Sequence, residues 1–446
     1  MGKLLAKSVL FISYFFPPVG GAGVQRAAKF AKFLPEHGWS PVVLTVENPS
    51  VPLFDETLSN EIPDSVKIIK AKTYEPSYQA KKSVSASAKR DSKDVGVYSL
   101  LRKTLRGFAN FVLQPDPQIL WFLSAKNAAN NFLKSNKVDA IFATAPPYSS
   151  LLLAAHLAKK YRIPLLLDYR DEWDISNEVW ENKGLNRISR AIQNRMQNYV
   201  IKRANTIVAT TYMSTMSIRG KVKKLGASCD TLCIYNGYDS QDFQTSQVNE
   251  KKSNGKYVLS YVGTLWNLTS IEPVILAIEK LAIKFPELFA SLSLVVAGRK
   301  TANQQALLQR LVDSKVTLTC HDYLVHYDAI QLMLESQGLC LLLSDINMAR
   351  RVVPAKIFEY LATKNSIFVV APEGEVWDLV KDYPRAYCAE PSDIDNIVSL
   401  LANDIDRFLR EGNTKVEGYS SEKYERRAQA LQLAQALNRM LNRDSN

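Results

Sequence analysis

The stretch RRVVPAKIFEYLA, residues 350–362, carries residues that suit phosphate and ribose chemistry. Proline favours the first turn of a helix, so Pro354 predicts that a helix begins there. The N–H groups of the next three residues would then face outward and, with the charge of Lys356, could hold an anion. Glu359 follows about one turn later, and its carboxylate suits the two hydroxyls of a ribose. Taken alone, the stretch also fits an ordinary helix with a lysine and a glutamate on its surface.

A glycine-rich loop, PPVGGAGVQR, follows the apolar run SVLFISYFF near the N-terminus. Gly20, Gly21 and Gly23 have no Cβ, so backbone N–H groups there can approach an anion, and the dipole of the following helix favours negative charge. The dinucleotide fingerprint G-x-G-x-x-G needs a third glycine, but this sequence has Arg26 instead. The alternative interpretation is a tight strand-to-helix turn with no ligand.

The third stretch is DYRDEWD, residues 168–174, at the carboxyl end of a predicted strand. Open α/β sheets bind their ligands at this end of their strands. Arg170 and Asp171 place a cation and a carboxylate there, next to the flat ring of Trp173. The stretch predicts either a functional pair or a structural Asp–Arg pair that holds the loop, and the sequence leaves both open.

These stretches need a scaffold, and the sequence predicts two α/β domains. Continuous apolar strands that alternate with helices are typical of a parallel sheet covered on both faces. In the first half we expect strands at 8–16, 40–47, 138–147, 163–171 and 204–211, with helices at 24–38, 124–135, 149–161 and 185–203. The second half restarts the pattern, with strands at 256–265, 292–299, 316–324, 338–345 and 366–374 and a helix at 271–286.

The polar segment 244–256 between the halves is poor in apolar residues and is predicted to be a linker. We therefore expect an N-terminal domain over 1–243, a C-terminal domain over 244–418 and a long amphipathic helix within 419–446. The 446 residues, 46% of them hydrophobic, suffice for two cores.

Charge and composition narrow the partners. The net charge of +12 favours anionic partners, but the sequence has no nucleic-acid-binding signature. It has no apolar run of about 18 residues, the length that spans a membrane. The N-terminal apolar stretch ends in prolines and glycines rather than a cleavage pattern, so we expect a buried strand and a cytoplasmic protein. The five cysteines are scattered and predict neither a disulfide framework nor a zinc site.

Two further features of the sequence bear on function. The segment 98–114 interleaves Leu, Phe and Val with Arg and Lys, so it predicts either peripheral contact with an anionic membrane or a surface helix with a solvated basic face. The pairs Asp393–Asp395 and Asp404–Asp406 match the D-x-D pattern that binds metal in some sugar transferases. Neither pair follows a strand, so we expect no metal site.

Together these pieces resemble the GT-B glycosyltransferases, and within them the large retaining family 4. PPVGGAGVQR is similar to that family's N-terminal loop, and IYNGYDSQDF to the N-G-x-D element that ends its first domain. TAPPYSS followed by IPLLLDYRDEW resembles elements of a bacterial cell-surface polysaccharide subgroup, and PAKIFEYLATKNSIFVVAPEG resembles the donor-site helix and following strand. The resemblance covers nearly the whole chain. It implies two Rossmann-like domains facing a central cleft, with the C-terminal helix packed back on the N-terminal domain.

The resemblance also assigns roles to residues. Glu359 matches the second glutamate of the family's E-x7-E motif, which takes the ribose hydroxyls. The glycine loop of the first domain would approach the phosphate and sugar from across the cleft. In the second domain, the resemblance assigns the diphosphate to the turn of Pro354, Ala355, Lys356 and Ile357, the base to Tyr323 and Leu324, and further donor contacts to Gly263 and Thr264.

The sequence departs from the family pattern at three places. Arg351 stands where the first glutamate of E-x7-E, which usually touches the transferred sugar, is expected. The usual phosphate-gripping lysine downstream of Gly263 is absent, so Lys356, Arg299 or Arg350 would supply that charge. The usual histidine of the first domain is not obvious. We expect His156 to be structural, so Asp171, beside Arg170, becomes the candidate for contact with the acceptor hydroxyl.

The implied function is transfer of a sugar, with retention, from a UDP- or GDP-sugar to a lipid-linked saccharide in surface polysaccharide synthesis at the inner membrane face. No metal or cofactor is expected to be required. The alternatives are a nucleotide-sugar epimerase or hydrolase on the same fold, and a non-catalytic nucleotide-sugar-binding protein. A Rossmann dehydrogenase is disfavoured by the incomplete fingerprint.

Overall fold

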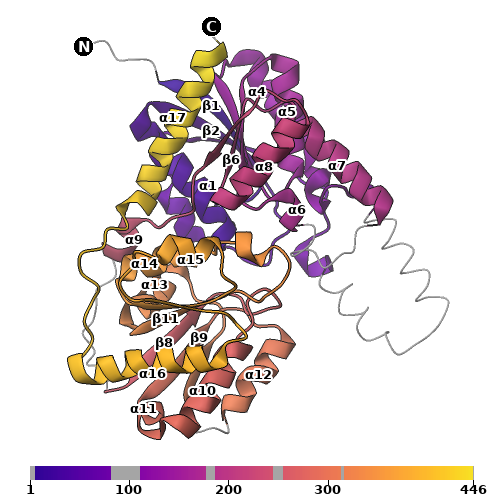
Figure 1. Cartoon of the computed structure of the whole chain (residues 1–446). Coiled ribbons are helices and arrows are strands. Elements are labelled where there is room, and N and C mark those ends of the chain that lie inside the picture. The colour runs from indigo at the N-terminus through magenta and orange to yellow at the C-terminus, as the bar shows by residue number, and fades with distance from the viewer. Residues whose placement is uncertain (1–5, 82–110, 177–185, 245–254, 313–315, 445–446) are drawn as a thin grey trace, which may run out of the picture. The chain divides into compact units, whose positions relative to one another are not determined.

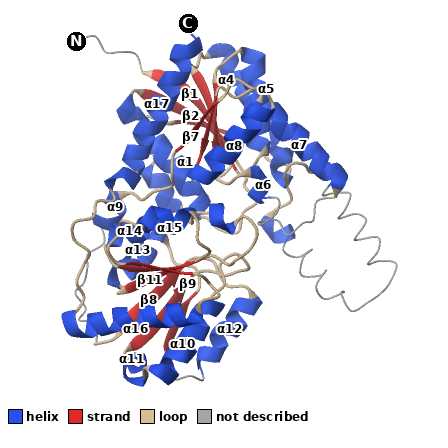
Figure 2. Cartoon of the chain, viewed as in Figure 1, coloured by secondary structure: helices blue, strands red, loops and turns tan. Residues whose placement is uncertain are grey.

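The structure, a computed structural model, describes residues 6–81, 111–176, 186–244, 255–312 and 316–444. The chain divides into two compact units. Unit 1 comprises Met1–Tyr235 together with Arg426–Asn446, and unit 2 comprises Asn236–Glu425. Figure 1 labels the elements along the chain, and Figure 2 shows strands at the centre of each unit with helices around them. The predicted linker 244–256 lies largely outside the described residues, as does most of the segment 98–114.

Unit 1 is built on a parallel sheet with the strand order β3-β2-β1-β4-β5-β6-β7. The central strands are buried on both faces, as their continuous apolar sequences predict. The chain reverses direction across the sheet between β1 and β4, the topological switch point of such a fold. The strands are β1 Lys7–Ile12, β2 Trp39–Val46, β3 Lys67–Ala71, β4 Ala140–Ala145, β5 Leu165–Tyr169, β6 Thr206–Ala209 and β7 Asp230–Cys233.

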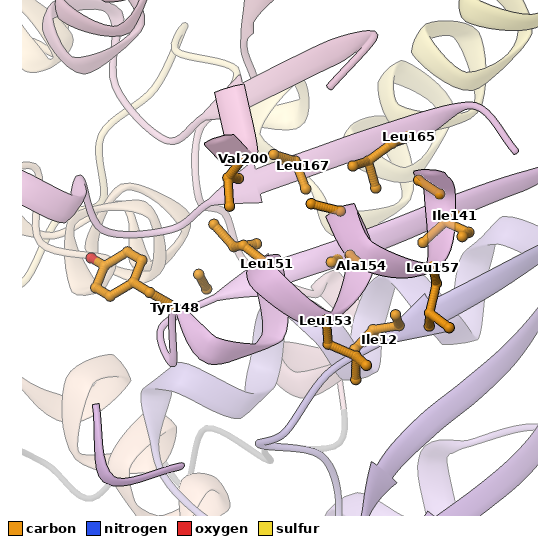
Figure 3. Close-up of a cluster of buried hydrophobic side chains, with 14 of the residues drawn as sticks. Ile12, Ile141, Tyr148, Leu151, Leu153, Ala154, Leu157, Leu165, Leu167 and Val200 are labelled. Atoms are coloured by element: carbon orange, nitrogen blue, oxygen red, sulfur yellow. The ribbon is translucent and has the colours of Figure 1, made fainter. Parts of the chain in front are cut away.

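Helices cover both faces of this sheet. The helices are α1 Ala22–Phe33, α4 Phe122–Ser135, α5 Ser149–Tyr161, α6 Trp173–Ile175, α7 Arg187–Ile201, α8 Tyr212–Lys224 and α17 Arg426–Asp444, with short 3-10 turns η1 Leu34–His37, η2 Glu56–Glu61 and η4 Pro117–Trp121. Figure 3 shows one face, where Leu151 and Leu157 of α5 lie against Ile12, Ile141 and Leu167 of the sheet. Each fully buried leucine contributes about 1.5–3 kcal/mol, so this face alone anchors α5 firmly.

The opposite face of the sheet is covered by α1 and by the C-terminal helix α17, which lies beside α1 in Figure 1. Leu433, Leu437 and Met440 of α17 are buried in the same cluster as Phe30 of α1. The expectation that the C-terminal helix packs back on the N-terminal domain is therefore confirmed.

Unit 2 repeats the plan with the strand order β10-β9-β8-β11-β12-β13, again all parallel, and its switch point lies between β8 and β11. The strands are β8 Tyr257–Val262, β9 Leu292–Ala297, β10 Thr317–His321, β11 Gly338–Leu342, β12 Ser366–Val370 and β13 Ala386–Ala389. The helices are α9 Ser240–Gln244, α10 Glu272–Lys284, α11 Pro286–Ala290, α12 Ala302–Val312, α13 His326–Glu335, α14 Lys356–Thr363, α15 Glu375–Val380 and α16 Ile394–Glu411, with 3-10 turns η6 Ala349–Arg351 and η7 Glu422–Tyr424.

The predicted fold class, α/β with two Rossmann-like domains, is confirmed. The edge strand β3 was not predicted, because its short KIIKA sequence has only two isoleucines between lysines and is mostly exposed or half-buried. No helix among the described residues has both the length and the apolar character needed to cross a membrane.

Candidate functional site

The helix α14 is fixed across the switch point of unit 2 by a buried tyrosine. The Tyr360 hydroxyl accepts a hydrogen bond from the N–H of Val262 at 3.3 Å and donates to the carbonyl of Cys340, also at 3.3 Å. Val262 ends β8 and Cys340 lies in β11, so the tyrosine spans the two strands between which the chain reverses. The start of α14 therefore belongs to the edge where folds of this topology bind ligands.

The first turn of α14 differs in detail from the prediction. The helix begins at Lys356, and the N–H of Ile357 donates to the carbonyl of Pro354 at 3.1 Å. The expectation of an outward-facing N–H at Ile357 was therefore wrong, because this N–H is used in a tight turn with Pro354 at the start of the helix. No side chain caps this helix end. The N–H groups of Ala355 and Lys356 have no hydrogen-bond acceptor among the described residues.

Lys356 and Glu359 form an ion pair, with 2.5 Å between Nζ and a carboxylate oxygen. Their side chains are 25% and 14% exposed. The two groups that the sequence assigned to phosphate and ribose thus neutralise each other in this structure. A partly buried pair of this kind can exchange its internal contact for two contacts to a ligand that offers both an anion and hydroxyls.

The loops after β8 and β9 touch each other so closely that one of them requires glycine. Gly298 has φ +124, and a Cβ there would lie 2.0 Å from the carbonyl oxygen of Gly263. A side chain at position 298 would therefore meet both backbone strain and a direct clash. Through this contact the structure brings Gly263 and the residue after Gly298, Arg299, to the same edge of the sheet.

The loop after β10 joins the same cluster. The N–H of Gly298 donates to the carbonyl of Asp322 at 2.7 Å, and Lys300 donates to the carbonyl of His321 at 2.6 Å. The remaining predicted residues of unit 2 lie on these loops: Thr264 and Arg299 are exposed, Tyr323 is 42% exposed, and Leu324 is half-buried. The side chain of Arg299 has no hydrogen-bond or ion-pair partner within the described part of the chain.

The arginines before α14 also lie near the end of a strand. Arg350 donates to the carbonyl of Glu373 at 3.2 Å, in the loop after β12. A Cβ on Gly374 would lie 2.5 Å from the carbonyl oxygen of Arg350, so the two loops are in direct contact. Arg351, which replaces the family's first glutamate, is half-buried.

In unit 1, the three glycines predicted from the sequence lie in three different local environments. A Cβ on Gly20 would lie 2.9 Å from Cγ of Leu53, so packing excludes a side chain there. Gly21 caps α1 with φ +103, a conformation that other residues rarely adopt. A Cβ on Gly23 would lie 3.1 Å from a guanidinium nitrogen of Arg170. The glycine loop and the DYRDEWD stretch are thus neighbours at the switch point of unit 1.

Arg170 and Asp171 lie at this edge with few internal partners. Arg170 donates to the carbonyl of Pro146 at 2.5 Å, while its other terminal nitrogen is buried without a hydrogen-bond partner among the described residues. Burial lowers the pKa of Arg170 although the neighbouring carboxylates oppose this. Burial also raises the pKa of Asp171, an effect that Arg170 opposes and Asp168 reinforces. Within the described residues, the Asp171 carboxylate accepts no hydrogen bond.

The structural Asp–Arg pair predicted as an alternative exists, but its arginine is Arg26. Arg26 and Asp168 are each 1% exposed, with 2.8 Å between guanidinium nitrogen and carboxylate oxygen. Thr144 also donates to Asp168 at 2.8 Å, and Arg26 donates to the carbonyl of Tyr235 at 2.8 Å. Sequence reasoning noticed Arg26 as the residue that interrupts the glycine fingerprint. The interruption places a buried cation on α1 opposite β5.

Several other residues singled out from the sequence are structural. Trp173 is 1% exposed and stacks on Tyr148 at 4.4 Å, so it offers no open platform to a ligand. His156 lies mid-helix in α5 with its ring 6.1 Å from that of Phe122, and burial and nearby lysines lower its pKa. Asp393 caps α16, and Asp404 is fully buried.

One group near Glu359 was missed by sequence reasoning. His326, the first residue of α13, lies 3.0 Å from a carboxylate oxygen of Asp242 in α9. Burial lowers the pKa of His326, but the hydrogen bond to Asp242 and the negative charge of Glu359 outweigh burial and raise the pKa above 6.5. Asp242 lies in the quoted IYNGYDSQDF stretch, and His326 lies two residues after Leu324. Nothing in their spacing of 84 residues predicts the contact.

Comparison with known proteins supports the fold. No known family model matches this sequence, and no curated protein matches it. Among solved structures, sucrose-phosphate synthase from Thermosynechococcus elongatus matches with a TM-score of 0.67 and 12% identity over 98% of this chain and 99% of that one. Anabaena Alr3699/HepE, in complex with UDP and glucose, matches with a TM-score of 0.60 and 13% identity over 97% and 99%.

A third structure is WaaG, a glycosyltransferase involved in lipopolysaccharide biosynthesis, with a TM-score of 0.52 and 13% identity over 98% of each chain. Because these matches span nearly the whole of both chains, the chain has the GT-B fold of glycosyltransferases. At identities this low, the likeness defines the fold and leaves the reaction to be argued from the site.

Proposed function

We propose that this protein is a glycosyltransferase that takes its sugar from a nucleotide-sugar donor bound by unit 2. The observation that carries the proposal is the Lys356–Glu359 pair at the start of α14, on the switch-point edge of the sheet. On donor binding, Lys356 and the N–H groups of Ala355 and Lys356 would donate hydrogen bonds to the diphosphate. Glu359 would accept hydrogen bonds from the ribose hydroxyls. The complexes of Alr3699/HepE with UDP and glucose make a UDP-sugar the first donor to test.

The remaining donor contacts follow from the same edge. Tyr323 and Leu324, on the exposed loop after β10, would contact the base. Gly263 and Thr264 would make further contacts to the donor, and Arg299 would add positive charge. When the anomeric bond breaks, negative charge builds on the leaving diphosphate. Cations and N–H groups already in place stabilise that charge without a reorganisation cost, which is the largest expected contribution to catalysis.

Unit 1 would bind the acceptor at its own switch-point edge. Asp171 has a carboxylate without internal hydrogen bonds and a raised pKa, so it is a stronger base than an ordinary aspartate and suits contact with an acceptor hydroxyl. Arg170, beside Gly23 of the glycine loop, would orient anionic or hydroxyl groups there.

We further propose membership of the retaining family 4, transfer with retention, and a lipid-linked saccharide acceptor in surface polysaccharide synthesis at the inner face of the cytoplasmic membrane. The motif resemblance supports these assignments, as does the fold likeness to WaaG. The net charge of +12 suits an anionic membrane surface.

The proposal is tested by calorimetric titration of UDP, GDP, ADP and CMP into the wild type and Glu359→Ala. Binding of one nucleotide, lost in Glu359→Ala, is expected. Glu279→Ala is the matched control, because Glu279 also pairs with a cation, Arg310, but on α10 rather than α14. Equal binding by wild type and Glu359→Ala would remove Glu359 from the site. Absence of binding by all four nucleotides would overturn the donor assignment.

Activity distinguishes transfer from the alternatives. The wild type is incubated with UDP-glucose and GDP-mannose, with and without lipid-linked saccharide acceptors. A transferase forms the new glycoside when the acceptor is present. Release of free sugar or a changed nucleotide-sugar without any acceptor would favour a hydrolase or an epimerase, and tight binding without turnover would favour a non-catalytic binding protein.

A further inference from the structure

Four charged side chains of alternating sign converge beside the proposed donor helix. Asp242 of α9 bonds to His326 of α13 at 3.0 Å, and Glu359 of α14 pairs with Lys356 at 2.5 Å. Helix α13 packs against both α9 and α14, and the charges of Glu359 and Lys356 act on His326. With His326 protonated, the order is negative, positive, negative, positive. We call these residues the quartet.

Asp242 is held in place by the segment to which it belongs. This segment begins unit 2, and its Tyr238 donates from its N–H to the carbonyl of Tyr424 at 3.1 Å. The Tyr238 hydroxyl also lies 2.8 Å from that of Ser421, and its ring stacks edge-on with Phe243 at 5.7 Å. A fixed Asp242 in turn fixes the orientation of the His326 ring.

We infer that His326, held by Asp242, positions Glu359 and balances its charge, so that nucleotide binding at this site weakens as the pH rises. This inference rests on the donor role proposed above for Glu359. His326 is a positioning residue, since it acts through Glu359. While His326 is protonated, its positive charge balances the negative charge of Glu359 and attracts an anionic ligand. Loss of the proton leaves two carboxylates, Asp242 and Glu359, with Lys356 as the remaining cation of the quartet.

The sign of the pH dependence follows from the groups facing His326. Asp242 and Glu359 favour the charged imidazole, while Lys356 and burial oppose it, and the outcome is a raised pKa. Because the pKa is raised, the contribution of charged His326 to nucleotide binding is complete below about pH 6.5. This contribution is lost as the pH rises through the higher pKa that His326 has in the folded protein.

The first test needs no nucleotide. The chain has 4 histidines, so their ring resonances can be followed by NMR across a pH titration and assigned with His326→Gln. The pKa of His326 is expected to fall toward its ordinary value in Asp242→Asn and in Glu359→Gln. If His326 titrates in both variants as it does in the wild type, the quartet does not interact and the inference fails.

The second test measures UDP affinity by calorimetry at about pH 6 and about pH 8. The wild type is expected to lose about fivefold more affinity across this interval than His326→Gln, whose side chain cannot gain charge. Comparison at each pH cancels the ionisation of UDP itself. His156→Gln, which removes a half-buried histidine from unit 1, should keep the wild-type dependence.

The two tests separate the inference from the proposed function. Equal pH dependence in wild type and His326→Gln would overturn the inference while leaving the donor site intact. If the wild type binds no UDP, the proposed donor fails, and the NMR titration still decides whether the quartet exists. Thermal unfolding of each variant shows that it is folded, and Asp242→Asn serves as the binding variant if His326→Gln does not fold.

Discussion

The two units share one strand order around their switch points, yet they place their buried ion pairs at opposite ends of the sheet. In unit 1 the pair Arg26–Asp168 lies near the carboxyl ends of the strands, beside the glycine loop. In unit 2 the fully buried carboxylate is Asp404, which accepts hydrogen bonds from Tyr257 and Ser366 at the starts of β8 and β12 and from Arg407. The same topology therefore places its most costly charges at different ends.

The difference distinguishes charged groups that stabilise the fold from charged groups that are available to a ligand. In unit 1 the internal pair holds α1 against β5, so the loop shape is fixed before any ligand arrives. In unit 2 the stabilising network sits at the far end of the strands. The switch-point edge keeps half-buried or exposed charged groups, namely Lys356, Glu359 and Arg299. The topology thus indicates the edge at which a ligand can bind in each unit, and the placement of charges decides which groups at that edge are available to it.

The largest effect is expected from breaking the Arg26–Asp168 ion pair in unit 1. Arg26→Met leaves the Asp168 carboxylate buried without its cation, so the free energy of unfolding should fall by about 3–5 kcal/mol. Arg407→Met in unit 2 removes a partner that is 18% exposed, and water can replace part of the interaction, so a smaller loss of about 1–3 kcal/mol is expected. Denaturant unfolding of both variants gives the comparison.

The double variant Arg26→Met/Asp168→Leu is the control for this prediction. It removes both charges and should recover much of the stability lost in Arg26→Met. If Arg26→Met is no less stable than Arg407→Met, the proposed difference between the two edges is wrong.

The next effect concerns the close contact between the loops of unit 2. Gly298→Ala places a Cβ 2.0 Å from the Gly263 carbonyl oxygen, at a φ of +124. Strain and displacement together should cost about 2–4 kcal/mol, measured by thermal or denaturant unfolding. Gly412→Ala is the control, because its φ is +78 but its Cβ would meet nothing within 4 Å, so about 1 kcal/mol is expected. Equal losses would mean that backbone strain, rather than the loop contact, explains the glycine.

The smallest stability effect concerns Asp171. Its folded-state pKa is raised above the ordinary value of 3.8, so stability is lost as the pH rises from that value through the raised pKa, and the loss is complete above it. Asp171→Asn should therefore be slightly more stable at pH 7, by less than about 1 kcal/mol, with the advantage shrinking as the pH falls. The transfer rate should fall by about 10²-fold or more if Asp171 takes the acceptor proton. Unchanged activity with raised stability would restrict Asp171 to a structural role.

Much of the scaffold was predictable because burial on both faces forces continuous apolar strands. The helix predicted at 149–161 coincides with α5, and the strand predicted at 40–47 lies within one residue of β2 at each end. The half-exposed edge strand β3 gave no such signal. At the candidate site, the sequence indicated Lys356 and Glu359 through helix spacing, but it did not indicate that the two pair with each other.

The sequence by itself determined the two α/β halves, the glycine loop and the presence of a helix just after Pro354, because each depends on residues within one element or one turn. Tertiary structure alone decided that Arg26 bonds to Asp168 rather than leaving this role to Arg170, and that His326 meets Asp242. These contacts join residues separated by 142 and 84 positions. The order of parallel strands and the packing of helices bring such residues together, and no local pattern in the sequence encodes their distance.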